Sequence, residues 1–456
     1  MTTRQTLALL RDYESRNVTF MEPDGSWPIV WDRAKGVQVW DADGKRYLDL
    51  TAAFGVAAAG HGNPRVIKAG QSQMDRLLHA MGDVHPHPLK AQLARELSRI
   101  TFERWTSQAK IQIPDSAVQS SKRNVTRKLA SAVTGKTIFA SSGFEAVEAA
   151  LKTALLATGR PGVIAFAGGY HGLGYGALNA THRDHFRSRF RDQLAEFGHF
   201  VPFPTKVAEL ERLEEAIRRL ARRKNIGAIL IEPIQVRGGI NLPPRELLPM
   251  LRRWCDEHEA LLILDEIYTG FGRTGRWFAC ERSETVPDLI CLGKALTGGF
   301  PLSACVGRAA VMDAAWPPSD GEAIHTSTFL GHPVGCAMAL AQIKEIAVRR
   351  LVEKSADLGQ VLLEALRAEI SNSEFPLSAR GEGLLAGLEI HLPDGLPGTQ
   401  AALKAIKAML HRGFILLPEG EHSNVIGFTP PLTISEKQLR RAVETLGRIL
   451  NHGGAG

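Results

Sequence analysis

The sequence lacks paired cysteines. Its five cysteines show no CxxC spacing and are odd in number, which argues against a disulfide framework and against a zinc site. We therefore expect reduced thiols, no bound metal and a cytoplasmic location. The five positions are Cys255, Cys280, Cys291, Cys305 and Cys336.

Long apolar runs are also missing. Arg11, Asp12 and Glu14 stand where a secretory segment would need an unbroken apolar stretch, and no run approaches the length of a membrane span. No internal repeat or low-complexity tract is visible apart from the short glycine-rich tail. The sequence therefore predicts a globular protein without a membrane partner.

A nucleic-acid motif is absent as well, although the net charge is +7. Basic residues gather at 187–191 (RSRFR) and at 218–224 (RRLARRK). The second cluster ends a helical pattern, where cations suit the helix dipole. We interpret both clusters as solvated surface and expect no nucleic-acid partner.

What is present is the composition of an ordinary globular protein, with 44% hydrophobic and 23% charged residues over 456 positions. This length exceeds that of one compact unit. We predict a large domain at 61–330 and a smaller α+β domain at 331–456. The N-terminal segment 1–60 is expected to pack with the small domain or with a partner chain.

Short apolar runs alternate with longer amphipathic ones from about residue 135 onward. Near-continuous apolar strands between helices are typical of a mostly parallel sheet that helices cover on both faces. The sequence therefore predicts an α/β fold, with ligands at the carboxyl ends of the strands. The expected strands are 137–140, 163–167, 228–231, 261–264, 289–292 and 302–306.

Two of these strands lead into charged residues. The run ALLILD ends in Asp265, and DLICLG is followed by Lys294. A lysine between apolar strands has a lowered pKa when it is buried, which makes its amine a better nucleophile. A surface lysine just past a strand end would give the same pattern, so Lys294 alone decides nothing.

A third strand leads into Ser142 and Gly143, followed by an amphipathic helix with Glu145 in its first turn. Free N–H groups and small residues make such a helix start an anion site, although an ordinary N-cap has the same pattern. A phosphate site, a carboxylate and an amine at the strand ends of one sheet match one cofactor. That cofactor is pyridoxal 5′-phosphate.

Over essentially its whole length the chain resembles the class III (omega) aminotransferases, which are pyridoxal-phosphate enzymes of fold type I. The segments that carry the resemblance are DADGKRYLDL, AAAGHGNPRV, SSGFEAVEAALK, GGYHG, EPIQ, LDEIYTGFGRTG, LGKALTGGFP, STFLGHP, RGEGLLAGLEI and TPPLTIS. The resemblance implies that Lys294 is the Schiff-base lysine and proton carrier. It also implies that Asp265 keeps the cofactor's ring nitrogen protonated.

Further cofactor contacts are implied by position. Ser142, Gly143 and the N–H of Phe144 correspond to the phosphate loop, and Tyr170 to the aromatic residue that stacks on the ring. Thr328 corresponds to a phosphate contact from a neighbouring subunit, which implies a homodimer with shared active sites.

Three other positions keep two interpretations. His171 is either a cofactor contact or a satisfied loop histidine. Tyr268 stands where relatives often carry glutamine, so its phenol either replaces that contact or lines the pocket. Glu232 either orients its neighbours or merely ends a strand before Pro233.

Substrate recognition departs from the family pattern. Many relatives carry EPIQGEGG and an arginine before a late PPL motif, whereas this chain has Arg237 in EPIQVRGGI and Gly427 in NVIGFTPPL. Arg237 either binds a substrate carboxylate, points to solvent, or pairs with a carboxylate of the chain such as Glu419 or Glu421. Phe54 is a further candidate substrate contact.

The resemblance implies transfer of an amino group from a primary amine or omega-amino acid to a keto acid or aldehyde, in two half-reactions. A class III aminomutase, racemase or decarboxylase would share the same lysine, aspartate and phosphate loop. A non-catalytic binding protein on the same fold is the alternative from another class. The segment 101–133 has no clear periodicity and is left unassigned.

Overall fold

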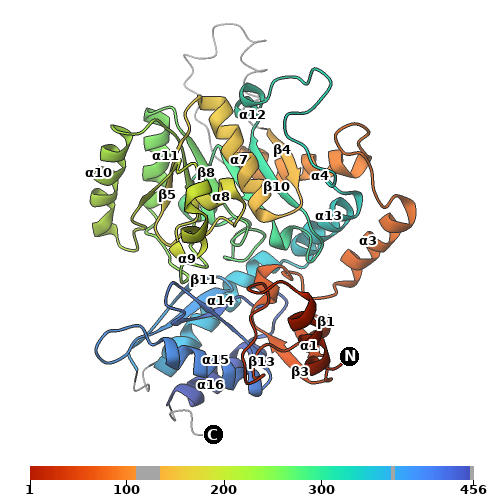
Figure 1. Ribbon diagram of the computed structural model, residues 1–456, viewed down its shortest axis with the longest axis vertical. Coiled ribbons are helices and arrows are strands. Elements are labelled where there is room, and N and C mark those ends of the chain that lie inside the picture. Colours follow the sequence, from red (N-terminus) through yellow and green to blue (C-terminus); the bar gives the residue numbers. More distant parts are fainter. Residues whose placement is uncertain (109–133, 371–374, 452–456) are drawn as a thin grey trace.

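The computed structural model describes residues 1–108, 134–370 and 375–451. Figure 1 shows a large α/β domain above a smaller domain that contains the N-terminus and the end of the chain. None of the helices in the described ranges is both long and apolar enough to cross a membrane. Most of the unassigned segment 101–133 lies outside the described residues.

The large domain is built on a sheet with the strand order β4-β10-β9-β8-β7-β5-β6. All neighbouring strands are parallel except those that involve β10, which runs antiparallel to β4 and β9. The strands are β4 (Gly135–Ala140), β5 (Gly162–Phe166), β6 (Gly198–Val201), β7 (Ile226–Ile231), β8 (Leu261–Asp265), β9 (Leu289–Leu292) and β10 (Ser303–Arg308).

Buried side chains cover both faces of this sheet. Leu262 and Leu264 of β8 belong to the core that includes α10 and α11, whereas Ile263 belongs to the core formed with α7. This alternation buries nearly every residue of the inner strands, which explains their continuous apolar runs. The predicted α/β class with a mostly parallel sheet is confirmed.

Helices surround the sheet in the large domain (Figure 1). Their bounds are α3 (Pro64–Arg76), α4 (Pro88–Ser98), α5 (Arg104–Gln108), α7 (Gly143–Thr158), α8 (Tyr175–Ala180), α9 (Asp184–Arg187), α10 (Leu210–Ala221), α11 (Leu247–Glu257), α12 (Ala309–Ala315) and α13 (Pro333–Val348). Shorter turns of π- or 3₁₀-helix are η1 (Arg99–Glu103), η3 (Ser188–Gln193), η4 (Val207–Glu209), η5 (Ala279–Ser283) and η6 (Lys294–Leu296).

Two features of the sheet differ from the expected strands. The segment between β9 and β10 is too short for the crossover that parallel strands need, so β10 turns back. Strand β6 was not among the expected strands, because GHFV is short and includes a polar residue. It forms the edge of the sheet beside β5.

The first strands of the chain join a late one in a second sheet, ordered β1-β2-β3-β13. A third sheet, β11-β12-β15-β14, completes the smaller domain. The elements outside the large domain are α1 (Thr3–Tyr13), β1 (Trp31–Lys35), β2 (Gln38–Asp41), β3 (Arg46–Asp49), α2 (Ala52–Gly55), α14 (Leu351–Ile370), β11 (Leu377–Glu382), β12 (Leu385–Ile390), α15 (Thr399–His411), β13 (Phe414–Ile415), β14 (Leu417–Glu419), β15 (Val425–Phe428) and α16 (Glu436–Asn451). Helix α13 packs against α3 and α4, so the boundary near residue 330 stays a prediction.

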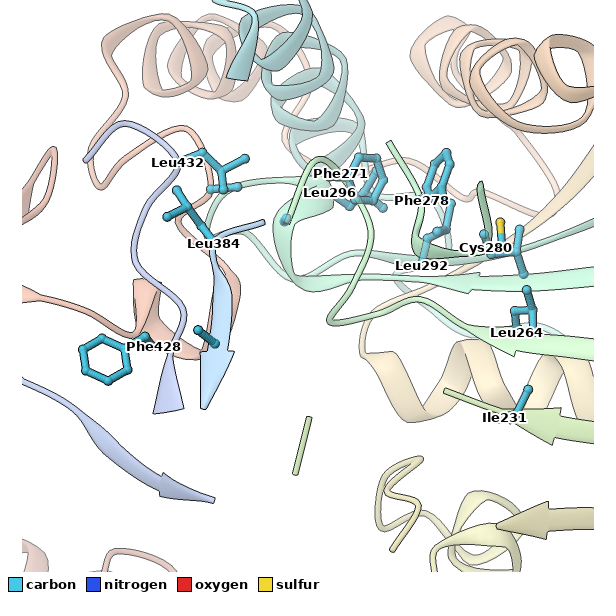
Figure 2. Close-up of a cluster of buried hydrophobic side chains, with 14 of the residues drawn as sticks. Ile231, Leu264, Phe271, Phe278, Cys280, Leu292, Leu296, Leu384, Phe428 and Leu432 are labelled. Carbon is cyan, nitrogen blue, oxygen red and sulfur yellow. The ribbon is translucent and has the colours of Figure 1, made fainter. Parts of the chain in front are cut away.

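One buried cluster connects the two domains. Figure 2 shows Leu384 and Leu432 of the smaller domain on the side facing Phe271 and Leu296 of the large one. Fully buried Arg273 also joins them, because its Nη1 donates to the carbonyl oxygen of Leu384 at 2.9 Å and to that of Pro430 at 2.5 Å. The relative position of the domains is therefore fixed by apolar packing and by a shared guanidinium.

Candidate active site

Five strands of the large sheet end at the same edge. Strands β4, β5, β7, β8 and β9 point the same way, since β4 and β9 both run opposite to β10. Ser142, Tyr170, Glu232, Asp265 and Lys294 lie at or just after these ends. The carboxyl edge of the sheet thus gathers the groups singled out from the sequence.

Asp265 is held by His171. The Nδ1 atom of His171 lies 2.8 Å from Oδ2 of Asp265, and both side chains are buried. The other carboxylate oxygen accepts a hydrogen bond from the N–H of Ile267 at 3.1 Å. The backbone N–H of His171 donates to Thr181 Oγ1 at 2.9 Å, which fixes the histidine loop. These contacts orient the carboxylate at the strand end.

Lys294 begins the short turn η6 after β9 and is half-buried. Its Nζ lies 4.3 Å from the ring centroid of Tyr268. Burial lowers the pKa of this amine, and the carboxylates of Asp265 and Glu232 partly oppose that shift. A lowered pKa leaves more of the amine neutral and therefore nucleophilic.

Glu232 connects two loops of the site. Its buried carboxylate accepts hydrogen bonds from the N–H of Tyr170 at 2.9 Å and from the N–H of Val236 at 3.3 Å. Burial raises the pKa of Glu232 to about 7. The side chain is thus more than the polar end of a strand, because it ties the Tyr170 loop to the EPIQ loop.

The start of α7 offers an anion site. Glu145 Oε2 accepts from the N–H groups of Ser141 and Ser142 at 2.9 and 2.7 Å, as in a capping box. The N–H groups of Gly143 and Phe144 have no hydrogen-bond partner among the residues that the structure describes. Free N–H groups in the first turn of a helix favour an anion there.

Phe144 and Gly143 leave only backbone at this helix start. The Phe144 ring packs over the loop after Tyr170, where Gly172 and Gly174 leave space that a Cβ atom would fill. A Cβ atom at Gly143 would lie 3.1 Å from Cδ1 of Ile267. The glycines therefore let the start of α7 pack closely against Ile267 and against the loop after Tyr170.

The two tyrosines of the site have different surroundings. Half-buried Tyr170 packs its ring edge-on against Phe186, with 5.5 Å between centroids. Tyr268 is buried under Lys294, and its hydroxyl lies 3.3 Å from Thr429 Oγ1. Burial raises the pKa of the Tyr268 phenol, which therefore stays neutral. Tyr268 bridges the large domain to the end of β15.

A left-handed turn lies beside Lys294. Ala52, Ala53 and Phe54 have φ angles of 47°, 49° and 61°, and Lys294 itself has a φ angle of 42°. The helical turn α2 that holds the first three residues contacts η6. Non-glycine residues adopt this conformation at a cost, and such strain gathers at functional sites. Phe54 is 50% exposed there.

Thr328 is not brought to the same place within one chain. It lies in an exposed loop. No hydrogen bond joins it to Lys294 or to the α7 start among the described residues. A contact from a second subunit, as the resemblance implies, is compatible with this exposure.

Arg237 forms an ion pair with the protein's own carboxylate. Its Nη1 lies 2.9 Å from Oε2 of Glu419, a buried residue of β14, while 31% of the Arg237 side chain stays exposed. Burial raises the pKa of Glu419 to about 7, although Arg237 acts in the opposite direction. A Cβ atom at Gly427 would lie 3.1 Å from Cγ of Glu419, so this glycine leaves room for the pair.

Comparison with known proteins identifies the family. The family model described as aminotransferase class-III matches residues 20–450. The chain belongs to the class III aminotransferases. It is 33% identical over 427 residues to the acetylornithine aminotransferase of Methanosarcina acetivorans, which covers 93% of each chain.

Other proteins similar to this class III aminotransferase are also named as aminotransferases. The 5-aminovalerate aminotransferase of Pseudomonas aeruginosa is 33% identical over 439 residues, covering 93% of this chain and 94% of that one. The ornithine aminotransferase of Toxoplasma gondii superposes with a TM-score of 0.79 at 26% identity, over 99% of this chain and 95% of that one. That structure is described with partial occupancy of pyridoxal phosphate at its active site.

The aminotransferase is pyridoxal-phosphate-dependent, and its residues fit that cofactor. The free N–H groups of Gly143 and Phe144 suit a phosphate, and the carboxylate of Asp265 suits a protonated ring nitrogen. The amine of Lys294 lies at the same sheet edge with its pKa lowered by burial. The predicted family, enzyme class and cofactor are confirmed.

Some residues of the site carried no signal in the sequence of the aminotransferase. Arg183 and Phe186 lie in no family motif, although Phe186 contacts Tyr170. Thr429 belongs to the TPPLTIS motif, but its bond to Tyr268 joins residues 161 positions apart. Arg183 stands between α8 and α9, away from any strand end, so the strand pattern gave no signal for it.

Proposed function

We propose that this class III aminotransferase moves an amino group from a primary amine or omega-amino acid to a keto acid or aldehyde, with Lys294 and Asp265 as its catalytic residues. The observation that supports this assignment best is the shared sheet edge. An amine of lowered pKa and a carboxylate oriented by His171 lie there together. A protein that only binds a ligand has no need for that combination.

The contacts within the site indicate which residues would bind the cofactor. The N–H groups of Gly143 and Phe144 with the hydroxyl of Ser142 would hold its phosphate, and Tyr170 would stack on its ring. Asp265 would hold the ring nitrogen, with His171 orienting that carboxylate. When bound, the cofactor supplies an electron-accepting ring. Glu232 and Tyr268 would wall the pocket.

Lys294 has two tasks in this proposal. Its neutral amine would hold the cofactor's aldehyde carbon, and after release the same amine would take and return a proton at the substrate carbon. Both tasks need a neutral amine near neutral pH. Burial of Lys294, which lowers its pKa, favours that state.

The relatives' names support the substrate class. Relatives are named for acetylornithine and 5-aminovalerate, and the latter carries its amine at the far end from its carboxylate. We include Phe54 and Arg237 among the substrate contacts. Both remain partly exposed in the single chain, so both are accessible to a ligand.

We further propose a homodimer in which Thr328 of the second subunit reaches the phosphate. The exposure of Thr328 supports this, as do apolar side chains left exposed along α3 and after it, among them Ile67, Met74 and Leu78. A cytoplasmic location is part of the same proposal, because the five cysteines are all free and buried.

The Lys294→Ala variant tests the function. With a ¹⁵N-labelled amine donor, the wild-type enzyme should deliver the label to pyruvate or 2-oxoglutarate, and the variant should lose this transfer by about 10³-fold. Label that stays in an isomer of the donor would indicate an aminomutase or racemase. Release of carbon dioxide without nitrogen transfer would indicate a decarboxylase.

Lys354 provides a matched control. It is another half-buried lysine whose pKa burial lowers, and its Nζ donates to the carbonyl oxygen of Thr433 in the smaller domain. Lys354→Ala should keep transfer within about twofold. An equal loss in both variants would mean that the assay reports folding, and the role of Lys294 would be rejected.

A further inference from the structure

A second arginine stands at the wall of the site. Arg183 directly precedes α9. The N–H of the preceding residue, His182, donates to the carbonyl oxygen of Gly169 at 2.9 Å, which anchors this segment to the loop that carries Tyr170. Its guanidinium carbon lies 5.5 Å from the centroid of Phe186, whose ring contacts Tyr170. The cation therefore lies one aromatic ring away from the residue proposed to stack on the cofactor.

Arg183 has no carboxylate partner among the described residues. Its side-chain hydrogen bond runs from Nη2 to the backbone carbonyl of Glu421 at 3.3 Å, at the loop after β14. The nearby carboxylate of Glu419 is already paired with Arg237. The carboxylate of Glu421 also acts on Arg183, but neither carboxylate forms an ion pair with it, so among the described residues Arg183 is the guanidinium of this wall without an ion pair.

The surroundings make that cation receptive to an anion. Burial lowers the pKa of the half-buried Arg183 and the neighbouring cation Arg237 lowers it further, while the carboxylates of Glu421 and Glu419 oppose this shift only in part. A cation with reduced hydration beside another cation gains most from an added negative charge. A guanidinium binds a carboxylate in a bidentate manner, through two parallel N–H···O hydrogen bonds.

We propose that Arg183 binds the carboxylate at the far end of the substrate from the reacting carbon. In this assignment Arg237 is held by Glu419 and borders the subsite, while Arg183 supplies a guanidinium that forms no ion pair with a described residue. The inference rests on the proposed aminotransferase function and specifies its substrate class. That class comprises omega-amino acids and keto acids with a second carboxylate.

The test compares 5-aminovalerate with pentylamine, which has the same length and no carboxylate. Arg183→Gln should lower kcat/KM for 5-aminovalerate by about tenfold or more, mainly through a higher KM, and leave pentylamine within about twofold. Arg183→Lys, which keeps the charge without the fork, should restore part of the loss. An equal loss on both donors would overturn the proposal.

Arg189→Gln is the matched control. Arg189 is exposed in η3, six residues from Arg183. Its substitution by glutamine removes the same charge from the protein. It should leave both donors unchanged. If Arg189→Gln reproduces the effect, the cause is the overall field and the proposed subsite is rejected.

A binding measurement separates this proposal from the proposed function. Glutarate carries two carboxylates and no amine, so its dissociation constant from calorimetry does not depend on turnover. Arg183→Gln should weaken glutarate binding to the cofactor-loaded enzyme by about tenfold, and an unchanged constant would overturn the subsite. A wild-type enzyme that binds glutarate but transfers nitrogen from no donor would refute the function alone.

Discussion

The site has two walls that are built differently. At the strand edge, each carboxylate has its partners within the large domain, as Asp265 has His171 and Glu232 has the N–H groups of Tyr170 and Val236. On the substrate side, Arg237 of the large domain pairs with Glu419 of the smaller domain. The first wall depends on the sheet, and the second depends on how the domains meet.

This difference suggests a division of labour. A sheet edge holds groups in one geometry, which suits a cofactor that never changes. Charges on loops and on a second domain can be replaced without disturbing the sheet. The family pattern is accordingly kept at Asp265 and Lys294, whereas Arg237 and Gly427 depart from it.

The largest effect in this comparison is expected at the strand edge. Asp265→Asn removes the negative charge that His171 orients, and kcat should fall by about 10³-fold. Asp288→Asn is the control, since Asp288 is an equally buried carboxylate that precedes β9 and pairs with Arg252 at 2.6 Å. It should lower stability in urea without changing kcat of the folded enzyme. Similar kcat losses in both variants would mean that Asp265, at the carboxyl edge of the sheet, has no greater effect on catalysis than Asp288 at the start of β9.

The substrate wall should show itself in the pH dependence of stability. Burial raises the folded-state pKa of Glu419 from 4.5 to about 7, so the folded protein binds this proton more tightly than the unfolded chain does. The stability contributed by Glu419 is therefore largest below about pH 4.5 and falls as the pH rises to about 7. Glu419→Gln should remove this slope, which amounts to about 3 kcal/mol at most.

Urea unfolding at pH 5 and pH 8 measures that slope. The exposed neighbour Glu421 offers the control, and Glu421→Gln should keep the wild-type dependence. Parallel pH profiles for wild type and Glu419→Gln would show that Arg237 compensates the burial of Glu419 fully. The carboxylate of the substrate wall would then have no net electrostatic cost of burial.

The smallest effect on kcat is expected at the contact between Tyr268 and Thr429, where the two walls meet. Tyr268→Phe removes the hydroxyl that lies 3.3 Å from Thr429 Oγ1 but keeps the ring beside Lys294. We expect a loss of about 1 kcal/mol in the free energy of unfolding, with kcat within about threefold. Tyr47→Phe, which removes a 2.8 Å bond to buried Asp41, should be more destabilising. A large kcat loss in Tyr268→Phe would give the phenol a role beyond packing.

The sequence allowed the fold class to be predicted because buried parallel strands are apolar throughout and helices are periodic. Strand β6 escaped notice because an edge strand buries less and needs no such run. The reversal of β10 follows from a short connection, so it was within reach of a count of residues.

For the candidate site, the sequence indicated single residues but not the pairs that they form. Asp265 and Lys294 stand out by their place after apolar strands, whereas the bond between His171 and Asp265 joins positions 94 apart. The Arg237 pair joins positions 182 apart across two domains, and the sequence offered Glu419 and Glu421 equally. Local patterns carry no information on such distances, which only the packing of the domains decides.

The left-handed turn at Ala52, Ala53 and Phe54 limits how this enzyme can be made more robust. Glycine would adopt these backbone angles freely, whereas each present residue costs about 1 kcal/mol there. Selection for heat resistance would therefore favour glycine at these positions, beside the reactive lysine. Glycine at position 54 would also remove the aromatic ring that we propose as a substrate contact, so a gain in thermostability there would weaken the proposed substrate binding.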